Sequence, residues 1–295
     1  MRWLKRLAVV VLAVAAAALL DRERRPRPTY QAEWLRAGDA TVRAVRGGRG
    51  DTTVVLIHGY AESLISWRPV FDRLAERYRV LAFDVPGFGV SDKPDAAYDL
   101  PTQLARLDDL LAHATGGPLV LVGHSMGGEL AAALALRHPD RVVALVLVSP
   151  AGFGLSAALD SMGPGTRGVV SWAAAAAAAG IVPVHDPGWL AEPPDRAGYL
   201  PAGDTAYRRA LRRVLEQFDF AALRDSVPAL RQPTLLVWGR QDPTIPFAIG
   251  ERLAATLPCV RFAPLAATLH RPNITDPDTV SALALDFLRR PTCAP

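Results

Sequence analysis

The sequence is poor in cysteine, with only Cys259 and Cys293 among its 295 residues. Neither belongs to a Cys-x-x-Cys pair or lies near a pair of histidines, which excludes a zinc site of that type. Two cysteines could still form one disulfide if the protein is exported. We expect two unpaired thiols instead, because Cys293 lies in a terminal segment of the kind that frays.

The sequence also lacks an extended run of positive charge in its body. The whole chain has a formal net charge of +4 and a pI near 9.4. Residues 1–28 alone hold seven Lys or Arg and two Asp or Glu, a net of +5, which leaves −1 for the rest. A nearly neutral body offers no cationic surface from which a nucleic acid could release counterions. The charge pattern therefore excludes nucleic acid as a partner.

The excess charge belongs to an N-terminal segment with a long apolar run. Residues 7–20 carry no charge and follow three basic residues. As a helix they would span about 21 Å, or about 27 Å if counted from Trp3, against a hydrocarbon core of roughly 30 Å. A secretory signal is the alternative, since Ala15–Ala17 offers a small-residue cleavage site. We predict that residues 1–28 are a membrane anchor or a signal segment, and that the protein is membrane-associated or exported to the cell envelope.

Short apolar strands alternate with amphipathic helices along the body of the chain. The strands lack polar alternation, which suits a parallel sheet buried on both faces. We expect strands at Val54–Ile57, Val80–Phe83, Leu119–Val122, Val142–Val148, Thr234–Trp238 and Val260–Ala263, and helices at Trp67–Arg77, Pro101–Ala114, Met126–His138, Phe247–Leu257 and Asp278–Arg290. Repeated units of strand and helix predict an α/β fold with a doubly wound, mostly parallel sheet.

This alternation breaks between residues 152 and 214. The stretch is rich in Gly, Pro and Ala, and its alanine tract at 173–179 predicts a helix that ends at Gly180. A structureless loop of roughly sixty residues would be unusual within a domain, so we expect an inserted helical cap, with low-complexity drift as the alternative. The expected domains are the N-terminal segment at 1–28, a core at 29–151 and 215–295, and the cap at 152–214.

One pentapeptide places a serine where a strand runs into a helix. Gly123-His124-Ser125-Met126-Gly127 has the pattern G-x-S-x-G, in which the sharp turn strains the serine backbone and leaves no room for side chains at 123 and 127. The hydroxyl would lie beside the helix N-terminus, whose dipole favours developing negative charge. A turn residue without chemistry is the alternative. The context predicts that Ser125 is a nucleophile.

Five motifs in this order resemble the α/β-hydrolase superfamily, and within it the capped ester hydrolases and the cofactor-free haloperoxidase-like members. They are VVLIHGY at 54–60, AFDVPGFGVSDKP at 82–94, LVLVGHSMGG at 119–128, LLVWGRQDPTIP at 235–246, and Leu269-His270 followed by Asp276-Pro277. The resemblance runs from about Asp39 to Leu288, apart from the cap. It implies an α/β-hydrolase fold and a Ser–His–Asp triad, and it says little about substrate.

A serine hydroxyl needs a base, and position separates the six histidines. His270 follows the last strand, where the family's order of serine, acid and histidine places the base. Asp242 follows the strand at 234–238 and precedes His270 by 28 residues, so both would reach one sheet edge, where the carboxylate orients the imidazole. The alternatives are a histidine without a role and an aspartate that only caps the turn before Pro243.

Two main-chain donors would stabilise the oxyanion. Met126 N–H follows the nucleophile, and Tyr60 N–H follows Gly59 in a segment that resembles the family's His-Gly-x loop. Loss of one such donor typically costs about 10²–10³ in rate. The sequence departs from the family at Leu269, where glycine commonly precedes the histidine.

A serine nucleophile argues against haloalkane dehalogenation and epoxide opening, for which relatives use an aspartate. We expect hydrolysis of a carboxylic ester, a small-molecule substrate, through an acyl-enzyme, without a cofactor or a metal. The apolar residues of the cap predict uncharged, short-to-medium acyl chains. The alternatives are perhydrolysis or carbon–carbon bond hydrolysis on the same triad, and a non-catalytic, membrane-tethered binding protein.

Overall fold

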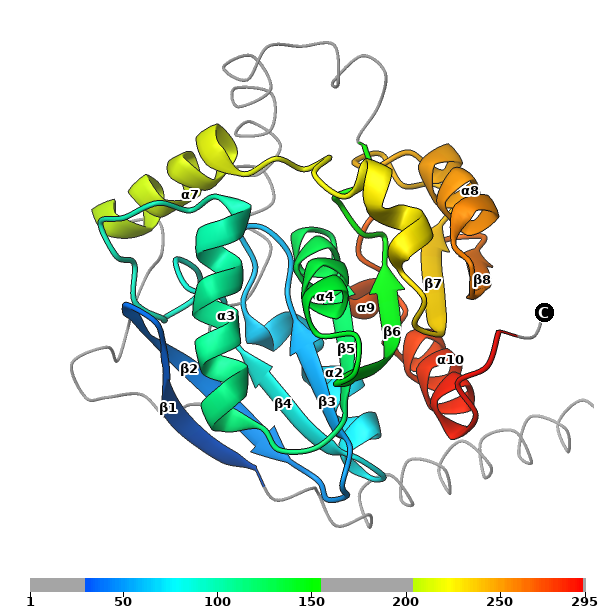
Figure 1. Ribbon diagram of the computed structural model, residues 1–295, viewed down its shortest axis with the longest axis horizontal. Coiled ribbons are helices and arrows are strands. Elements are labelled where there is room, and N and C mark those ends of the chain that lie inside the picture. The colour runs from blue at the N-terminus through cyan, green and yellow to red at the C-terminus, as the bar shows by residue number, and fades with distance from the viewer. Residues whose placement is uncertain (1–29, 155–203, 294–295) are drawn as a thin grey trace, which may run out of the picture.

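The computed structural model describes residues 30–154 and 204–293. Within these residues eight strands form one sheet with helices on both faces (Figure 1). The strands are β1 (Gln31–Ala37), β2 (Ala40–Gly47), β3 (Thr53–Ile57), β4 (Arg79–Phe83), β5 (Leu119–His124), β6 (Val142–Val148), β7 (Thr234–Gly239) and β8 (Val260–Leu265). Their order across the sheet is β1-β2-β4-β3-β5-β6-β7-β8.

Most of the sheet is parallel. β1 pairs with β2 and β2 with β4 in antiparallel fashion, whereas every later pair from β4 to β8 is parallel. The expected doubly wound, mostly parallel α/β sheet is therefore confirmed. The carboxyl ends of parallel strands share one edge, so the segments that follow β3, β5, β7 and β8 come together there.

The sheet separates the core into two layers, and helices cover each of them. In the described part of the chain the helices are α2 (Arg68–Ala75), α3 (Leu100–Ala114), α4 (Met126–Arg137), α7 (Thr205–Gln217), α8 (Phe247–Thr256), α9 (Pro272–Thr275) and α10 (Pro277–Arg289), and the 3₁₀ turns are η1 (Leu64–Trp67) and η4 (Arg224–Ala229). One core lies under α3, α4 and α8, and the other under α2 and α10 (Figure 1). Successive β3 residues enter opposite cores: Val55 and Ile57 the first, Val54 and Leu56 the second.

The hairpin β1–β2 precedes Val54–Ile57, the first strand whose bounds the sequence predicts. Hydropathy does not reveal the bounds of β2, because Arg43 is fully buried at a position where a buried strand normally has an apolar residue. Arg43 Nε donates to Asp84 Oδ2 at 2.9 Å, and neither side chain is exposed. A buried charge is tolerated only with such a partner, and the partner lies 41 residues away.

Two predicted segments fall mostly or wholly outside the described residues. These are the N-terminal segment at 1–28 and most of the cap at 152–214, and both remain predictions. Helix α7 is a described part of the predicted cap, and it continues through the predicted boundary at residue 214 to Gln217. Of the helices in residues 30–154 and 204–293, none is both long and apolar enough to cross a membrane.

Cys259 and Cys293 form a disulfide, so the expectation of two unpaired thiols is wrong. The physical reason is the docking of α10, which buries Val280, Ala284 and Phe287 in the second core. This helix returns the chain to the amino end of β8, where Cys259 is buried. A terminal segment that is tied down in this way does not fray.

Candidate active site

Ser125 lies at the junction of β5 and α4. Its backbone has φ 51° and ψ −120°, a combination that costs on the order of 1–3 kcal/mol for a residue with a side chain. A Cβ at position 123 would overlap the carbonyl oxygen of Gly127, and one at position 127 would overlap that of Ile57. The two glycines thus permit the sharp turn, which leaves Ser125 half-buried at the carboxyl end of β5.

His270 lies on the loop between β8 and α9, beside the carboxyl end of β7. A Cβ at Gly239 would overlap the carbonyl oxygens of Thr268 and Leu269, so the glycine at the end of β7 lets this loop approach. On its other side the loop is held by Asn273, which is fully buried and donates to a backbone carbonyl of η1 at 3.2 Å. Leu269, at the departure from the family pattern, is 50% exposed and takes no part in the core.

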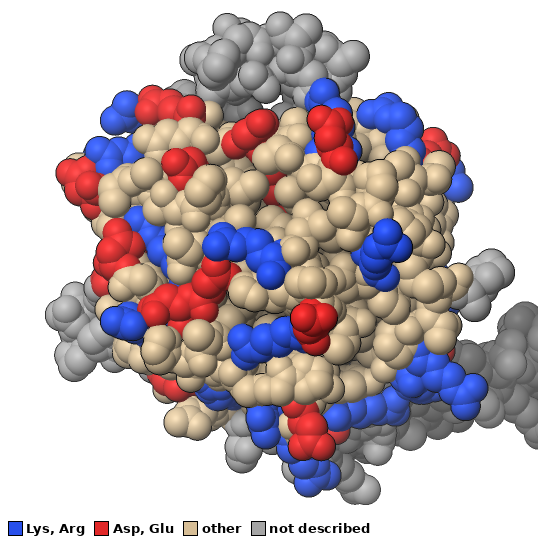
Figure 2. All heavy atoms as spheres, in the orientation of Figure 1, with Lys and Arg blue, Asp and Glu red and all other residues tan. Residues whose placement is uncertain are grey.

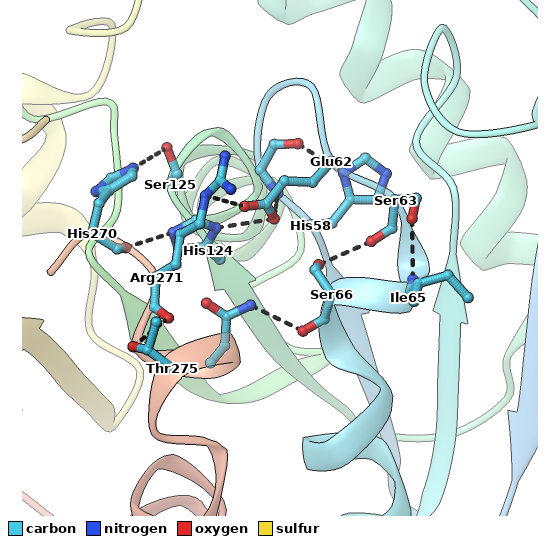
Figure 3. Close-up of polar contacts among 12 residues, drawn as sticks. His58, Glu62, Ser63, Ile65, Ser66, His124, Ser125, His270, Arg271 and Thr275 are labelled. Carbon is cyan, nitrogen blue, oxygen red and sulfur yellow. Dashed lines mark hydrogen bonds and ion pairs between the residues drawn. The ribbon is translucent and has the colours of Figure 1, made fainter. Parts of the chain in front are cut away.

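The structure brings Ser125, His270 and Asp242 into one chain of hydrogen bonds. His270 Nε2 lies 3.1 Å from Ser125 Oγ (Figure 3), and His270 Nδ1 lies 2.8 Å from Asp242 Oδ2. Asp242 Oδ1 accepts the backbone N–H groups of Thr244 and Ile245 at 2.8 and 2.9 Å. Because an ionised carboxylate only accepts, His270 Nδ1 carries the proton and Nε2 is left to accept the serine proton.

Burial sets the charge of this histidine. The Asp242 side chain is fully buried, and that of His270 is only 13% exposed. Burial lowers the pKa of His270 below its ordinary value; the hydrogen bond with Asp242 opposes this shift, and the neighbouring His124 adds to it. The neutral imidazole is thereby favoured near pH 7, and this is the form that a general base needs.

The segment after β3 lies against the strand-to-helix turn. A Cβ at Gly59 would come within 2.9 Å of His124 Nδ1 and 3.2 Å of Ser125 Cβ, so glycine permits this approach. Tyr60 follows Gly59 directly, and Met126 follows Ser125 as the first residue of α4. The main-chain N–H groups of Tyr60 and Met126 therefore come from two segments that touch beside the serine.

Buried polar side chains hydrogen-bond the segment after β3 to the segment after β4. His58 Nε2 accepts the N–H of Val85 at 2.9 Å, which leaves its Nδ1 to donate to the carbonyl of Gly59 at 2.8 Å. Asp84 Oδ1 accepts the N–H of Leu64 at 2.8 Å, in addition to its contact with β2. These two groups have structural roles here.

Sequence reasoning missed a second polar cluster beside this site. Glu62 Oε2 accepts the N–H of Gly59 at 3.1 Å and lies 3.2 Å from His124 Nδ1, while Glu62 Oε1 lies 3.2 Å from Arg271 Nε. All three side chains appear together beside His270 in Figure 3. The only signal in the sequence was Glu62 itself, because no other Asp, Glu, Lys or Arg occurs in residues 53–67.

Among the residues that the structure describes, no three His, Cys, Asp or Glu side chains gather so as to hold a metal ion. On the face shown in Figure 2, basic and acidic side chains are interspersed, with uncharged areas between them. The charges on this face thus form no large patch of one sign.

Comparison with known proteins agrees with the fold. A family model described as the alpha/beta hydrolase fold matches residues 52–187, which include β3, the strand-to-helix turn and β6. The chain belongs to the α/β-hydrolase superfamily. The resemblance in the motifs therefore holds at the level of the superfamily.

Two relatives and one solved structure illustrate this membership. The uncharacterized hydrolase YugF of Bacillus subtilis (strain 168) is 29% identical over 81% of this chain and 91% of its own length. A 2-hydroxy-6-oxo-6-(2'-aminophenyl)hexa-2,4-dienoic acid hydrolase of Metapseudomonas resinovorans is 39% identical over 42% of this chain and 43% of its own length. The crystal structure of a membrane phospholipase A, at 25% identity and a TM-score of 0.62, covers 99% of both chains. The α/β-hydrolase family and these neighbours support hydrolysis as the class of reaction.

Proposed function

We propose that this α/β-hydrolase is a serine hydrolase that cleaves carboxylic esters with apolar, short-to-medium acyl chains. The observation that carries the proposal is the continuous line of hydrogen bonds from Ser125 through His270 to Asp242. In this assignment Ser125 is the nucleophile, His270 is the general base and Asp242 orients the imidazole. Superfamily membership supports the same class of chemistry.

The proposed reaction follows from the protonation states that the hydrogen bonds assign. His270 Nε2 takes the Ser125 proton as Oγ attacks the ester carbonyl carbon, and the carbonyl electron pair moves onto its oxygen. Asp242 stabilises the imidazolium that forms. When the carbonyl re-forms, the bond to the leaving alcohol breaks, and the alcohol takes the proton from His270. Water then attacks the acyl-Ser125 ester as His270 takes its proton, and His270 returns that proton to Ser125 Oγ as the acyl bond breaks and the carboxylic acid is released.

The main-chain N–H groups of Tyr60 and Met126 are the proposed oxyanion donors. Their support is the close contact between Gly59 and the turn at Ser125, which brings the two segments together on one side of the serine. Met126 also begins α4, so the helix dipole favours negative charge at this point. Such preorganised donors stabilise charge that develops only in the transition state.

Apolar surroundings support an uncharged acyl group. The Tyr60 ring packs edge-on against Phe88, and its hydroxyl donates to the carbonyl of Leu211 in α7 at 3.1 Å. Tyr60 also packs against the apolar core that contains Met126 and Tyr207. A charged acyl chain would lose its hydration here without gaining a partner. The predicted cap at 152–214 would add further apolar surface over the site.

One relative favours a second candidate, carbon–carbon bond hydrolysis on the same triad. The dienoic acid named for the Metapseudomonas resinovorans relative has no ester bond, so its hydrolysis must break a carbon–carbon bond. Ester hydrolysis remains the first candidate, because an ester needs only the serine, the base and the oxyanion donors. Perhydrolysis and a non-catalytic membrane-tethered role are two further candidates, and labelling of the serine together with a substrate series separates them.

We also propose that the protein is exported or membrane-associated through residues 1–28. The sequence supports this with its apolar run after three basic residues. The disulfide between Cys259 and Cys293 supports it independently, because structural disulfides persist in oxidising compartments outside the cytosol. The membrane phospholipase A that covers 99% of this chain is consistent with the same placement.

A fluorescent phosphonate probe tests the proposed nucleophile, and a substrate series tests the bond that is cleaved. We expect covalent labelling of Ser125 and the highest kcat/KM on neutral p-nitrophenyl esters from acetyl to octanoyl. Absence of labelling would favour the non-catalytic role. Faster turnover of a 6-oxo-dienoic acid would favour carbon–carbon hydrolysis, and faster peracid formation in hydrogen peroxide would favour perhydrolysis. Highest activity on anionic esters would contradict the apolar acyl site.

A further inference from the structure

His124, the residue before Ser125, makes contacts that the proposed mechanism does not use. It is 1% exposed, and its Nε2 lies 2.8 Å from the backbone carbonyl oxygen of His270. Its Nδ1 lies 3.2 Å from Glu62 Oε2. Figure 3 shows the ring between these two partners. His124 thus joins the end of β5 to the loop that carries His270 and to the segment after β3.

The partners of His124 assign its charge. A backbone carbonyl oxygen only accepts, so His124 Nε2 donates to His270. Glu62 accepts from Gly59 N–H through Oε2 and contacts Arg271 through Oε1, which is the pattern of an ionised carboxylate. Burial alone would raise the pKa of Glu62, but attraction from His124 and Arg271 holds it well below the ordinary value. Both nitrogens of His124 therefore donate, and the ring is an imidazolium.

Glu62 is an unusual residue to bury, and its position explains why it is tolerated. Its side chain is 1% exposed, and every contact above is to a donor. A buried carboxylate is stable only when it is fully hydrogen-bonded to such donors. These donors come from three segments: Gly59 after β3, His124 at the end of β5 and Arg271 after β8. In the proposed mechanism these segments carry an oxyanion donor, the nucleophile and the base.

We propose that His124 is a positioning residue: held as an imidazolium by Glu62, it fixes the backbone of His270 and couples the loop of the base to the oxyanion loop. The inference rests on the proposed function, in which His270 is the base. A reacting histidine must be held in a narrow range of positions, since displacements of about 1 Å can cost roughly 10²-fold in rate. His124 restrains the main chain of His270, while Asp242 restrains its ring.

The same arrangement has an electrostatic consequence. The rings of His124 and His270 have centroids 4.9 Å apart, so the charge on His124 disfavours protonation of His270. Asp242 from the loop after β7 and Glu62 from the segment after β3 favour its protonation, and Arg271 lies next to it on its own loop. Together Glu62, His124 and Arg271 carry a net charge of +1. Replacing His124 with a neutral residue removes that charge, and His270 then binds a proton more easily.

The test compares His124→Asn with His138→Asn in the full-length protein. His138 is a matched control, because it also contacts a carboxylate, that of Asp108 at 2.7 Å, but at the far end of α4. Nitrogen-15 NMR of labelled histidines measures the protonation midpoint of His270 without any substrate. We expect His124→Asn to raise this midpoint by roughly one pH unit. His138→Asn should leave it unchanged.

Kinetics on p-nitrophenyl butyrate supply the second readout. His124→Asn should lower kcat by about 10-fold or more, with little change in KM, and shift the acid limb of kcat/KM to higher pH. Because Glu62 acts in part through His124, adding Glu62→Gln to His124→Asn should lower kcat by less than the product of the two single losses. His124→Gln replaces His124→Asn if thermal melting shows that the asparagine variant is unfolded.

Two results would overturn the positioning role: an unchanged His270 midpoint in a folded His124 variant, or an unchanged kcat. Fully additive losses in the double variant would also contradict it, since they would mean that Glu62 acts independently of His124. Failure of the proposed function is distinguishable, because it would appear as absence of ester turnover in the wild-type protein. The NMR midpoints would still decide the role of His124 in that case.

Discussion

The hydrogen bond between Asp242 and His270 fixes the orientation of both side chains. One carboxylate oxygen of Asp242 lies 2.8 Å from His270 Nδ1, and the other accepts the N–H groups of Thr244 and Ile245. The turn therefore fixes the rotation of the carboxylate, and the carboxylate fixes the tautomer of the imidazole. The two interpretations of Asp242, as turn cap and as orienting acid, are compatible, because Oδ1 caps the turn while Oδ2 faces the imidazole.

Replacing Asp242 with asparagine should reverse that tautomer. The turn N–H groups would hold the amide oxygen, which leaves the NH₂ group facing His270 Nδ1. Nδ1 would then accept, and the proton would move to Nε2, where it blocks transfer from Ser125. We expect kcat on p-nitrophenyl butyrate to fall by about 10⁴-fold while the melting temperature changes little. A loss smaller than about 10-fold in a folded variant would contradict the orienting role.

The activity should persist to lower pH than an ordinary histidine allows. Burial lowers the pKa of His270, and only the neutral imidazole can take the serine proton. The acid limb of kcat/KM, which reports the free enzyme, should therefore have its midpoint below about 6.5. Activity is then full above that midpoint and is lost as pH falls through it. A midpoint above the ordinary value would mean that Asp242 outweighs burial.

The disulfide should contribute to stability and not to turnover. Cys259 precedes β8 at its amino end, whereas His270 follows the carboxyl end of the same strand. Removing a bridge between residues this far apart in sequence should cost about 2–4 kcal/mol of unfolding free energy. The double variant Cys259→Ser/Cys293→Ser should melt at a lower temperature and keep the kcat of the wild-type protein below its melting range. Two reactive thiols in the oxidised wild-type protein would refute the bridge.

Residues 1–28 should direct the protein to a membrane and be dispensable for catalysis. We predict that a protein lacking them is soluble and active, with a lower pI because the remainder carries a net charge of −1. The full-length protein should sediment with membranes, held by its apolar run and helped by the basic residues that flank it. Fractionation decides this. Full-length protein in the soluble fraction with its N-terminus intact would contradict both the anchor and the signal predictions.

The parts of the fold that were predictable are those encoded locally. Runs such as Val142–Val148 are apolar without alternation, and this pattern alone indicates a strand buried on both faces. The glycines at 123 and 127 indicate the sharp turn at Ser125 because the close approach they permit involves neighbours in sequence or an adjacent strand. These features can be predicted without knowing which distant residues come into contact.

The parts that were missed depend on pairs far apart in the chain. Arg43 is buried because Asp84, 41 residues later, neutralises it. Glu62 and His124 are 62 residues apart, and each alone is read as a surface or turn residue. Such pairings exist only once the sheet brings the strands together, so hydropathy and spacing cannot reveal them.

Ser125 is the proposed nucleophile, and Ser125→Ala tests this assignment most directly. The substitution removes one hydroxyl and barely changes packing, so the melting temperature should stay close to that of the wild-type protein. We predict that turnover of p-nitrophenyl butyrate falls by about 10⁴-fold or more and that phosphonate labelling disappears. Turnover comparable to that of the wild-type protein in the folded Ser125→Ala variant would contradict the assignment of Ser125 as the nucleophile.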